Sequence, residues 1–534
     1  MVSWSTRLTG SFIGLVVCVL GVLPISGHTA DDESKAPEGV EEAEALIGAW
    51  HVEDAQEVIP DLLRDNPESP EVLDIAALLA YYQGDYEKSL STLAKALAIE
   101  ADNEQRHALN LLLQQTRDTT KHFKRFESEH FILYLDERRD GILAGPALTA
   151  LEQAHTEVGR ELGYWPRSKV RVEIAPDVAA FNAISTLSLR DIEETGAIGL
   201  CKFNKVMIIS PRVLAHGYRW LDSLTHEYIH FAIVNLTKNK APIWLHEGVA
   251  RYYETLWRNP LERDKPDYLT PANETLLAQA NAAQKFISFK EMEPSLIRLD
   301  TPEQVQLAYA EAASAIDYVK QTKGPTGVRS VLTEVANRST AEAIERVMGM
   351  PFDEFEMNWR GFLKQQGLKP VEGSSVRKYK VKKDADDEEI VDLREIRSEV
   401  ARSRTRLADR LQARGRMRAA TAEYQRALRA GPNSTIVLNK LAEALVNAKE
   451  YDQALPHLEK ARYLSPDLVR VYYLLGQLHH NAANYPAARG ALAEALEINP
   501  FHTGVYRILS QVYKAEGNED GIKDIQETLN KLRG

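Results

Sequence analysis

Apolar residues recur at helical spacing on both sides of a short polar turn in the middle of the chain. Residues three and four apart lie on one face of a helix, so a helix over 220–236 would present a continuous apolar stripe. That stripe consists of Leu221, Leu224, Tyr228 and Phe231. Pro242 is suited to begin a second helix, because its missing N–H is not needed in a first helical turn. The pattern predicts two helices joined by a turn short enough to fold the second back on the first.

Short apolar runs upstream predict a small β-sheet. The three clearest runs are 131–135, 170–175 and 206–210. We expect residues 196–202 to pair with the last of them, and a helix over 146–162 to connect the first two. A sheet that leads into the central helices predicts an α+β domain, which we place at 119–370.

Apolar and small residues also recur every 34 residues in the C-terminal part of the chain. The frame is marked by Leu407, Leu441, Leu475 and Leu509, and by Pro432, Pro466 and Pro500. Small residues where two helices touch and a breaker at the turn are the pattern of tetratricopeptide repeats. We therefore expect an all-α solenoid of about four repeats over 396–534, the last of them a cap.

A weaker copy of the same frame lies near the N-terminus. The segment Tyr81-Tyr82-Gln83-Gly84-Asp85-Tyr86 followed by Ala94-Lys95-Ala96-Leu97 resembles a tetratricopeptide repeat. Two repeats are few for a free-standing solenoid, so we expect this block, 31–118, to pack on the domain that follows. The fold class predicted is a multi-domain chain, with an α+β domain between two helical repeat segments.

Composition and charge limit the classes of function. The 534 residues are 44 % hydrophobic and 27 % charged, as in a soluble protein of several domains. A net charge of −12 argues against a general binder of nucleic acid or of anionic membranes. Adjacent lysine-rich and acidic blocks within 371–395 predict a solvated, flexible linker.

Residues 1–30 have the pattern of a secretory signal. Arg7 provides the positive charge, an apolar run over 12–23 follows, and small residues end the segment. The run is shorter than the about 20 residues of a membrane span, so we expect no stable span after signal cleavage. The protein is therefore expected to be periplasmic or extracellular. An anchor formed by an uncleaved signal is one alternative, and lipidation at Cys18, which the bulky Val17 opposes, is another.

Cleavage of the signal would leave Cys201 as the one cysteine of the mature chain. No intrachain disulfide is then available, and the apolar run before Cys201 favours a buried, inert thiol.

Polar residues with metal-ligand chemistry lie on the other face of the first central helix. His226 and His230 are four apart, so their imidazoles lie one turn apart and can reach the same ion. Glu227 is placed to take a proton from a water rather than to bind the ion. On the second helix Glu247 is the natural third ligand, because a cation would neutralise its charge. Considered alone, the polar face that Glu247 shares with Arg251 and Glu254 is explained by exposure to solvent.

These residues carry a family resemblance. H-E-x-x-H at 226–230, followed from Pro242 by P-x-W-L-x-E-G-x-A-x-Y-Y-E, resembles the peptidase-MA-like gluzincins, which are thermolysin-type zinc metallopeptidases. The resemblance implies a thermolysin-like zincin domain and one Zn²⁺ per chain. It makes His226, His230 and Glu247 the metal ligands and Glu227 the general base and proton shuttle.

The resemblance also indicates where a substrate would lie. An edge strand of the sheet commonly accepts the substrate backbone in that fold, which points to residues 195–203. Tyr309, in the helix that follows the third ligand, is the candidate donor to the tetrahedral oxyanion, with a merely packed tyrosine as the alternative. Tyr252 and Tyr253 are weaker candidates for that task.

Two classes of function follow. The first is an exported zinc metallopeptidase, a peptide-bond hydrolase whose repeats bind a substrate or partner protein. An endopeptidase is favoured because the chain has no G-x-M-E-N-like stretch for a free amino terminus. The second is a tetratricopeptide adaptor or chaperone-like scaffold with a structural or vestigial zinc site. A membrane-embedded peptidase is excluded because no later apolar run is long enough for a span.

Overall fold

The computed structural model describes residues 15–16, 37–189, 192, 197–258, 265–376 and 393–533. Two predicted segments fall mostly outside this part. Only residues 15–16 of the expected signal are described, and residues 377–392 of the expected linker lie outside the described residues.

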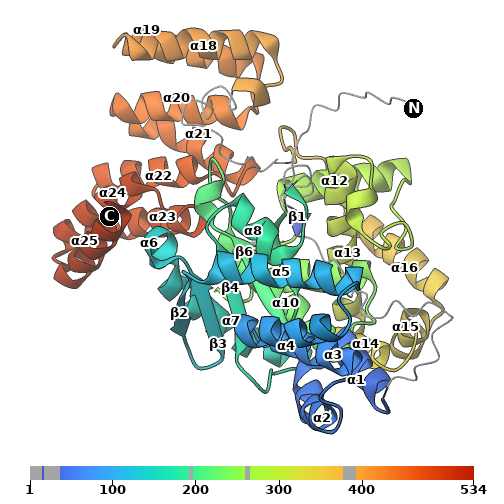
Figure 1. Cartoon of the computed structure of the whole chain (residues 1–534). Coiled ribbons are helices and arrows are strands. Elements are labelled where there is room, and N and C mark those ends of the chain that lie inside the picture. Colours follow the sequence, from blue (N-terminus) through green and yellow to red (C-terminus); the bar gives the residue numbers. More distant parts are fainter. Residues whose placement is uncertain are drawn as a thin grey trace, which may run out of the picture.

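A six-stranded sheet lies at the centre of the described chain, in the order β1-β5-β6-β4-β3-β2 (Figure 1). The strands are β1 (Leu15–Val16), β2 (Lys124–Glu127), β3 (Phe131–Leu135), β4 (Val170–Ala175), β5 (Ala197–Lys202) and β6 (Lys205–Ile209). β4 runs parallel to both β3 and β6, whereas β2 and β5 are antiparallel to their neighbours. The three predicted runs are therefore strands, and residues 197–202 pair with β6 as predicted, with Cys201 opposite Val206.

Two helices cover one face of this sheet. α7 (Ala144–Leu162) packs on β3, and α10 (Trp220–Thr237) packs on β5, β6 and α7. Strand residues at alternate positions point to the same side of the sheet. Those that face α7 and α10 are apolar and belong to one buried core. Phe131 of β3 meets Tyr228 of α10 edge to face, with ring centroids 5.2 Å apart. The sheet thus supports the helix that carries the two histidines.

The N-terminal helices cover the opposite face. They are α1 (Val40–Gly48), α2 (Val52–Asp65), α3 (Pro70–Tyr82), α4 (Tyr86–Ile99) and α5 (Glu104–Thr120), together with α8 (Val178–Ser185) after β4. The expectation that this block packs on the following domain is confirmed, because α3 and α4 bring aromatic rings onto the sheet. Tyr81 of α3 lies against Phe203, beyond β5, with ring centroids 5.2 Å apart.

A buried ionic network joins the same block to the sheet. Nζ of Lys205 lies 2.8 Å from Oε2 of Glu173, and Nε of Arg171 lies 2.7 Å from Oε1 of Glu173. The hydroxyl of Tyr86, at the start of α4, donates to the same Oε1 over 2.8 Å. Burial disfavours the charge of Glu173, but Lys205 and Arg171 lower its pKa to about 2. Glu173 is therefore an ionised side chain inside the protein.

The chain after α10 is helical up to residue 365. α11 (Ile243–Tyr253) begins directly after Pro242 and folds back on α10, as the sequence predicts. α13 (Pro302–Lys323) packs along α11. The remaining helices of this part are α12 (Pro271–Ala283), α14 (Gly327–Val335), α15 (Thr340–Met348) and α16 (Phe352–Gln365). Short elements are α6 (Glu137–Asp140), η1 (Gly141–Leu143), η2 (Pro211–Val213) and η3 (Leu296–Arg298).

The C-terminal part consists of successive antiparallel helix pairs, stacked as a solenoid (Figure 1). The pairs are α18 (Glu399–Ala413) with α19 (Met417–Ala430), α20 (Thr435–Asn447) with α21 (Tyr451–Leu464), α22 (Val469–Asn481) with α23 (Tyr485–Ile498), and α24 (Thr503–Glu516) with α25 (Glu519–Arg533). Each helix of a pair buries its small and apolar residues against its neighbour, which is the reason for the repeating frame. Among the described residues, no helix combines the length and the apolar character that crossing a membrane requires.

Candidate metal centre

The two histidines and Glu247 come together where α11 crosses α10. All three side chains are buried, and their ligand atoms lie within 4.8 Å of one another. Oε2 of Glu247 is 3.3 Å from Nε2 of His226 and 3.5 Å from Nε2 of His230. Both imidazoles therefore direct the same nitrogen at one carboxylate oxygen, which is the convergence that a tetrahedral cation site needs. The role of these residues as metal ligands remains a prediction.

The two histidines differ in protonation. Burial opposes the charge of His226, but hydrogen bonds to Glu247 and Glu254 raise its pKa to about 9, so a cation there would displace a proton from this ring. Burial lowers the pKa of His230, which keeps its imidazole neutral. A neutral imidazole is the form that coordinates a metal. Both ring nitrogens of His230 are buried without a hydrogen-bond partner, and a buried polar atom without a partner is costly. A cation bound by Nε2 would remove half of that cost.

The side chain of Glu227 reaches toward Gly199 on β5. Both of its carboxylate oxygens are buried without a hydrogen-bond partner. A Cβ at Gly199 would lie 2.4 Å from Oε1 of Glu227, so only glycine at that strand position leaves room for the carboxylate. Burial and the nearby charge of Glu247 raise the pKa of Glu227 well above 4.5. The carboxyl is thus held beside the ligand cluster and next to β5, and its role as the general base remains a prediction.

A residue that sequence reasoning did not assign to the site lies behind His226. Nδ1 of His226 is 2.9 Å from Oε2 of Glu254, and Nη1 of Arg251 donates to Oε1 of Glu254 over 2.8 Å. A carboxylate on the second ring nitrogen fixes the tautomer and orientation of a ligating histidine. The spacing of Glu254, seven residues after Glu247, places both on one helix face and was the available signal.

Replacing Glu254 by glutamine is expected to weaken zinc affinity by about 10–100-fold, the usual cost of losing such a supporting carboxylate. The amide keeps the shape but loses the charge that holds the His226 ring. Competition with a chromogenic chelator measures the change. Glu291→Gln is a suitable control, because Glu291 is an exposed capping residue bonded to Ser288. Equal affinities in both variants would contradict the role assigned to Glu254.

The tyrosines considered as oxyanion donors lie in three environments. The hydroxyl of Tyr252 donates to Oδ1 of Asp317 over 3.3 Å. Tyr253 is buried on the side of α11 that faces the core. Tyr309 is buried on α13, the helix that packs along α11. Its role as an oxyanion donor remains a prediction.

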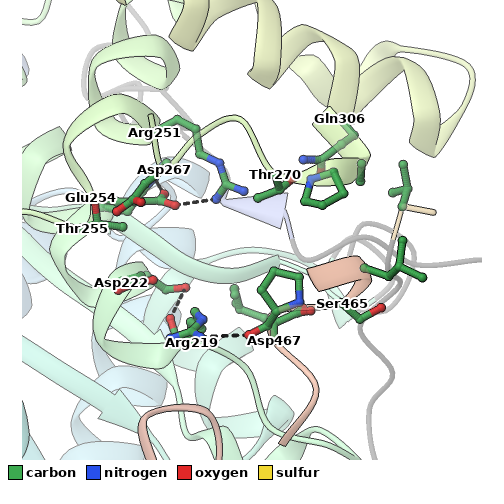
Figure 2. A pocket seen from close by; sticks show the side chains of 18 of the residues that line it. Arg219, Asp222, Arg251, Glu254, Thr255, Asp267, Thr270, Gln306, Ser465 and Asp467 are labelled. Atoms are coloured by element: carbon green, nitrogen blue, oxygen red, sulfur yellow. Dashed lines mark hydrogen bonds and ion pairs between the residues drawn. The ribbon is translucent and has the colours of Figure 1, made fainter. Parts of the chain in front are cut away.

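His226 and Glu254 line a cavity. Figure 2 shows Glu254 in its wall. Ile198 of β5 forms part of its wall, so the cavity borders the strand edge predicted to receive a substrate. Residues 197–203 of that predicted region are described, and the short strand β1 pairs in parallel with them, Leu15 opposite Ala197. In this structure β1, which lies within the expected signal, therefore occupies that edge of β5. Cys201, further along β5, is buried, and burial raises its pKa well above 9.0, as expected of an inert thiol.

A second group of potential ligands lies between α7 and the start of β3. It consists of His130, Glu152 and His155. Here both carboxylate oxygens of Glu152 already have partners, because His130 approaches one with its backbone N–H at 2.8 Å and the other with Nδ1 at 2.6 Å. The His130 ring stacks on His155 with centroids 3.8 Å apart. Protein contacts therefore satisfy the carboxylate of this group, although Nε2 of His155 is buried without a hydrogen-bond partner.

Comparison with protein families places the site in a known superfamily. Residues 160–365 match the family model described as Peptidase MA superfamily, a range that includes His226, His230 and Glu247. Two models described as tetratricopeptide repeat match residues 405–469 and 445–512. The matched repeats lie in the C-terminal part, and the N-terminal repeat assignment remains a prediction. A search of curated proteins finds no match.

Several solved structures of MamA have partial similarity to this chain. "Crystal structure of MamA protein" is 24 % identical over 25 % of this chain and 74 % of that chain, with a TM-score of 0.24. "MamA 41-end from Desulfovibrio magneticus RS-1" is 21 % identical over 25 % and 73 %, with a TM-score of 0.23. TM-scores this low support no conclusion about this chain. The family models show that the chain contains a Peptidase MA superfamily domain followed by tetratricopeptide repeats.

Proposed function

We propose that this protein is a zinc-dependent peptidase, an endopeptidase that cleaves extended polypeptide segments. The observation that carries the proposal is the convergence of three buried donors, His226, His230 and Glu247, beside the partnerless carboxyl of Glu227. Two imidazoles and one carboxylate are a donor set that suits zinc and leaves a fourth position open. When bound there, Zn²⁺ would polarise a peptide carbonyl and lower the pKa of a water molecule.

Proton transfer, positioning of the ligands and stabilisation of the oxyanion are assigned to residues of the chain. Glu227 accepts a proton from the attacking water and returns it to the leaving amine, which is the task of a general base in this position. Glu254 holds the ring of His226 in place through its hydrogen bond to Nδ1. Gly199 keeps space open for the Glu227 carboxyl at the strand edge. Tyr309 is the proposed donor to the oxyanion, which a buried hydroxyl stabilises more than water does.

The substrate is proposed to bind as an added strand on β5. The pairing of β1 with the same strand supports this arrangement, since β1 places an extended backbone on that edge and lies within the proposed signal, whose removal would free the edge. Main-chain hydrogen bonds to an edge strand give affinity for polypeptides of many sequences. We further propose that the protein is exported, on the signal pattern of residues 1–30, and that the repeats bind a protein partner.

Zinc analysis combined with a cleavage assay tests the proposed function. The purified full chain is expected to hold one zinc and to cleave an unfolded protein substrate. A chelator is expected to abolish cleavage, and added zinc to restore it, because the water loses its activation without the ion. Bound zinc without cleavage of any of several unfolded substrates would favour the scaffold function instead. Full cleavage in the zinc-free protein would refute the metallopeptidase.

A further inference from the structure

One helix pair of the C-terminal solenoid differs from the others in charge. Over residues 435–464, 469–498 and 503–533, basic and acidic residues are equal in number. The first pair, α18 and α19 over residues 399–430, holds nine arginines, no lysine and three acidic residues, Glu399, Asp409 and Glu423. It is strongly basic in a chain whose net charge is −12. Because all four pairs share one architecture, this excess of arginine is not required to build a repeat.

Five of the nine arginines face solvent. The carboxylate of Glu423 pairs with Arg404 and Arg426, and that of Asp409 pairs with Lys440. Within the described part of the chain, no ion pair or side-chain hydrogen bond involves the other exposed arginines of this pair that lie near its turn, Arg406, Arg410, Arg414, Arg416 and Arg418. Two of the three carboxylates are therefore balanced within the protein, and five cations remain on its surface.

These five arginines lie together around the end of α18. Arg406 and Arg410 are four residues apart, so they lie one turn apart on one face of the helix, and Arg414 continues that line directly after its last turn. Arg416 precedes α19, and Arg418 is in its first turn. The cations thus form a continuous group rather than a scatter over both helices.

Apolar side chains are exposed on the same face of α18. Val400 is 60 % exposed and Leu407 is 43 % exposed. They are seven residues apart, which places them on one side of the helix, beside Arg410 and Arg414. The buried residues of α18 lie on its other side, against α19. We call the face formed by Val400, Leu407 and the five arginines the arginine surface.

The arginine surface lies at the end of the solenoid that points away from the central sheet (Figure 1). Later repeats contact the peptidase domain instead. The guanidinium of Arg219, directly before α10, donates to the backbone oxygen of Pro466 over 2.9 Å and to Oε2 of Glu494 over 2.8 Å. Docking of the solenoid through these repeats leaves the arginine surface accessible to another molecule.

The chemistry of the arginine surface fits an acidic polypeptide. A guanidinium binds a carboxylate through two parallel N–H donors, so a row of arginines recognises a run of carboxylates. A polypeptide also supplies apolar side chains that can contact Val400 and Leu407. A membrane or a nucleic acid is an extended polyanion, which the acidic remainder of the chain would repel. A short acidic segment can reach the surface without that repulsion.

We propose that the arginine surface docks an acidic polypeptide segment of a partner protein, with Arg406, Arg410 and Arg414 binding its carboxylates. This inference rests on the proposed binding of a protein partner by the repeats, and it assigns that binding a place and a chemistry. It does not depend on the proposed peptidase activity, because the surface lies outside the metal centre.

Peptide binding to the full chain tests the arginine surface. Glu227→Gln protein is used so that the probe is not cleaved, and fluorescence anisotropy follows a short labelled peptide of glutamates with interspersed leucines. Binding is expected, and it should weaken as salt is raised, because salt screens exposed charges. Replacing Arg406, Arg410 and Arg414 together by glutamine is expected to raise Kd by about tenfold, since each exposed ion pair contributes about a twofold to threefold factor. The same peptide with glutamine in place of glutamate is expected to bind at least as weakly.

The matched control replaces Arg507, Lys514 and Lys523 together by glutamine. These are exposed cations of the last repeat, at the other end of the solenoid. The change in net charge is the same, and Kd is expected to stay unchanged. Equal weakening in the control, equal binding of the glutamine peptide, or binding of phosphatidylglycerol vesicles in place of the peptide would overturn the proposal.

The full chain also keeps its own acidic block at 384–389. If that block already satisfied the arginine surface, the acidic peptide would not bind, and this result would overturn the proposal as well. Failure of the peptidase function is detected separately, as the absence of zinc-dependent cleavage by the unaltered chain. Peptide binding that is insensitive to the three arginine substitutions would place the partner site elsewhere on the protein and refute the arginine surface alone.

Discussion

Replacing Glu227 by glutamine is expected to lower peptide hydrolysis by about 10²–10⁴-fold while zinc remains bound, the range that a general base contributes. The amide nearly preserves the volume of the side chain, so the space left by Gly199 remains filled. It cannot accept the proton of the attacking water. Initial rates on a fluorogenic peptide, with the zinc content of the same sample, measure the two effects together.

Two histidine variants serve as the positive and negative controls for this result. His226→Ala removes a proposed ligand and is expected to lose both zinc and cleavage. His155→Ala belongs to the second group, in which protein contacts satisfy the carboxylate, and is expected to keep both. Cleavage at the original rate in Glu227→Gln would contradict its role as the base. Loss of zinc in that variant would instead show that Glu227 holds the metal.

Much of the candidate metal centre could be predicted from the sequence, because its residues lie close together in the chain. The spacing of His226 and His230 fixes their common face on any α-helix, and the short turn before Pro242 limits where α11 can go. Glu254 was missed because an acidic residue on a polar helix face is ordinarily exposed. Its contact with His226 depends on how α11 crosses α10, which no short pattern encodes.

Contacts between distant parts of the chain could not be predicted from the sequence. In the sequence, Arg219 is an ordinary charged residue before a predicted helix. In the structure it contacts Pro466, which is 247 residues away in the chain. The 34-residue frame predicts helix pairs but not which inter-repeat turn will face the peptidase domain. Alternation within 170–175 predicts a strand, and it does not show that Glu173 is covered by α4. Such contacts depend on how whole domains meet.

Replacing Lys205 by methionine is expected to destabilise the junction of the sheet with the N-terminal helices by about 3–5 kcal/mol, because it leaves Glu173 buried with one cation fewer. Hydrogen exchange of the α4 and β4 amides reports the local free energy of opening, and should become about a hundredfold faster or more. Lys202→Met is the matched control. Lys202, on β5, is also a buried lysine. Its partner among the described residues is the neutral hydroxyl of Thr186, to which it donates over 3.2 Å.

The same network predicts a dependence on pH. The pKa of Glu173 is lowered from 4.5 to about 2, so the folded state favours the ionised carboxylate. Its stabilising contribution is fully present above pH 4.5 and is lost as the pH falls through that value toward 2. Glu173→Gln should therefore flatten the loss of junction stability over this acidic range, as measured by the same amide exchange. An identical acid profile in the variant would show that Glu173 is not the titrating group. Equal effects of Lys205→Met and Lys202→Met would mean that burial of a long side chain, rather than ion pairing with Glu173, stabilises the junction.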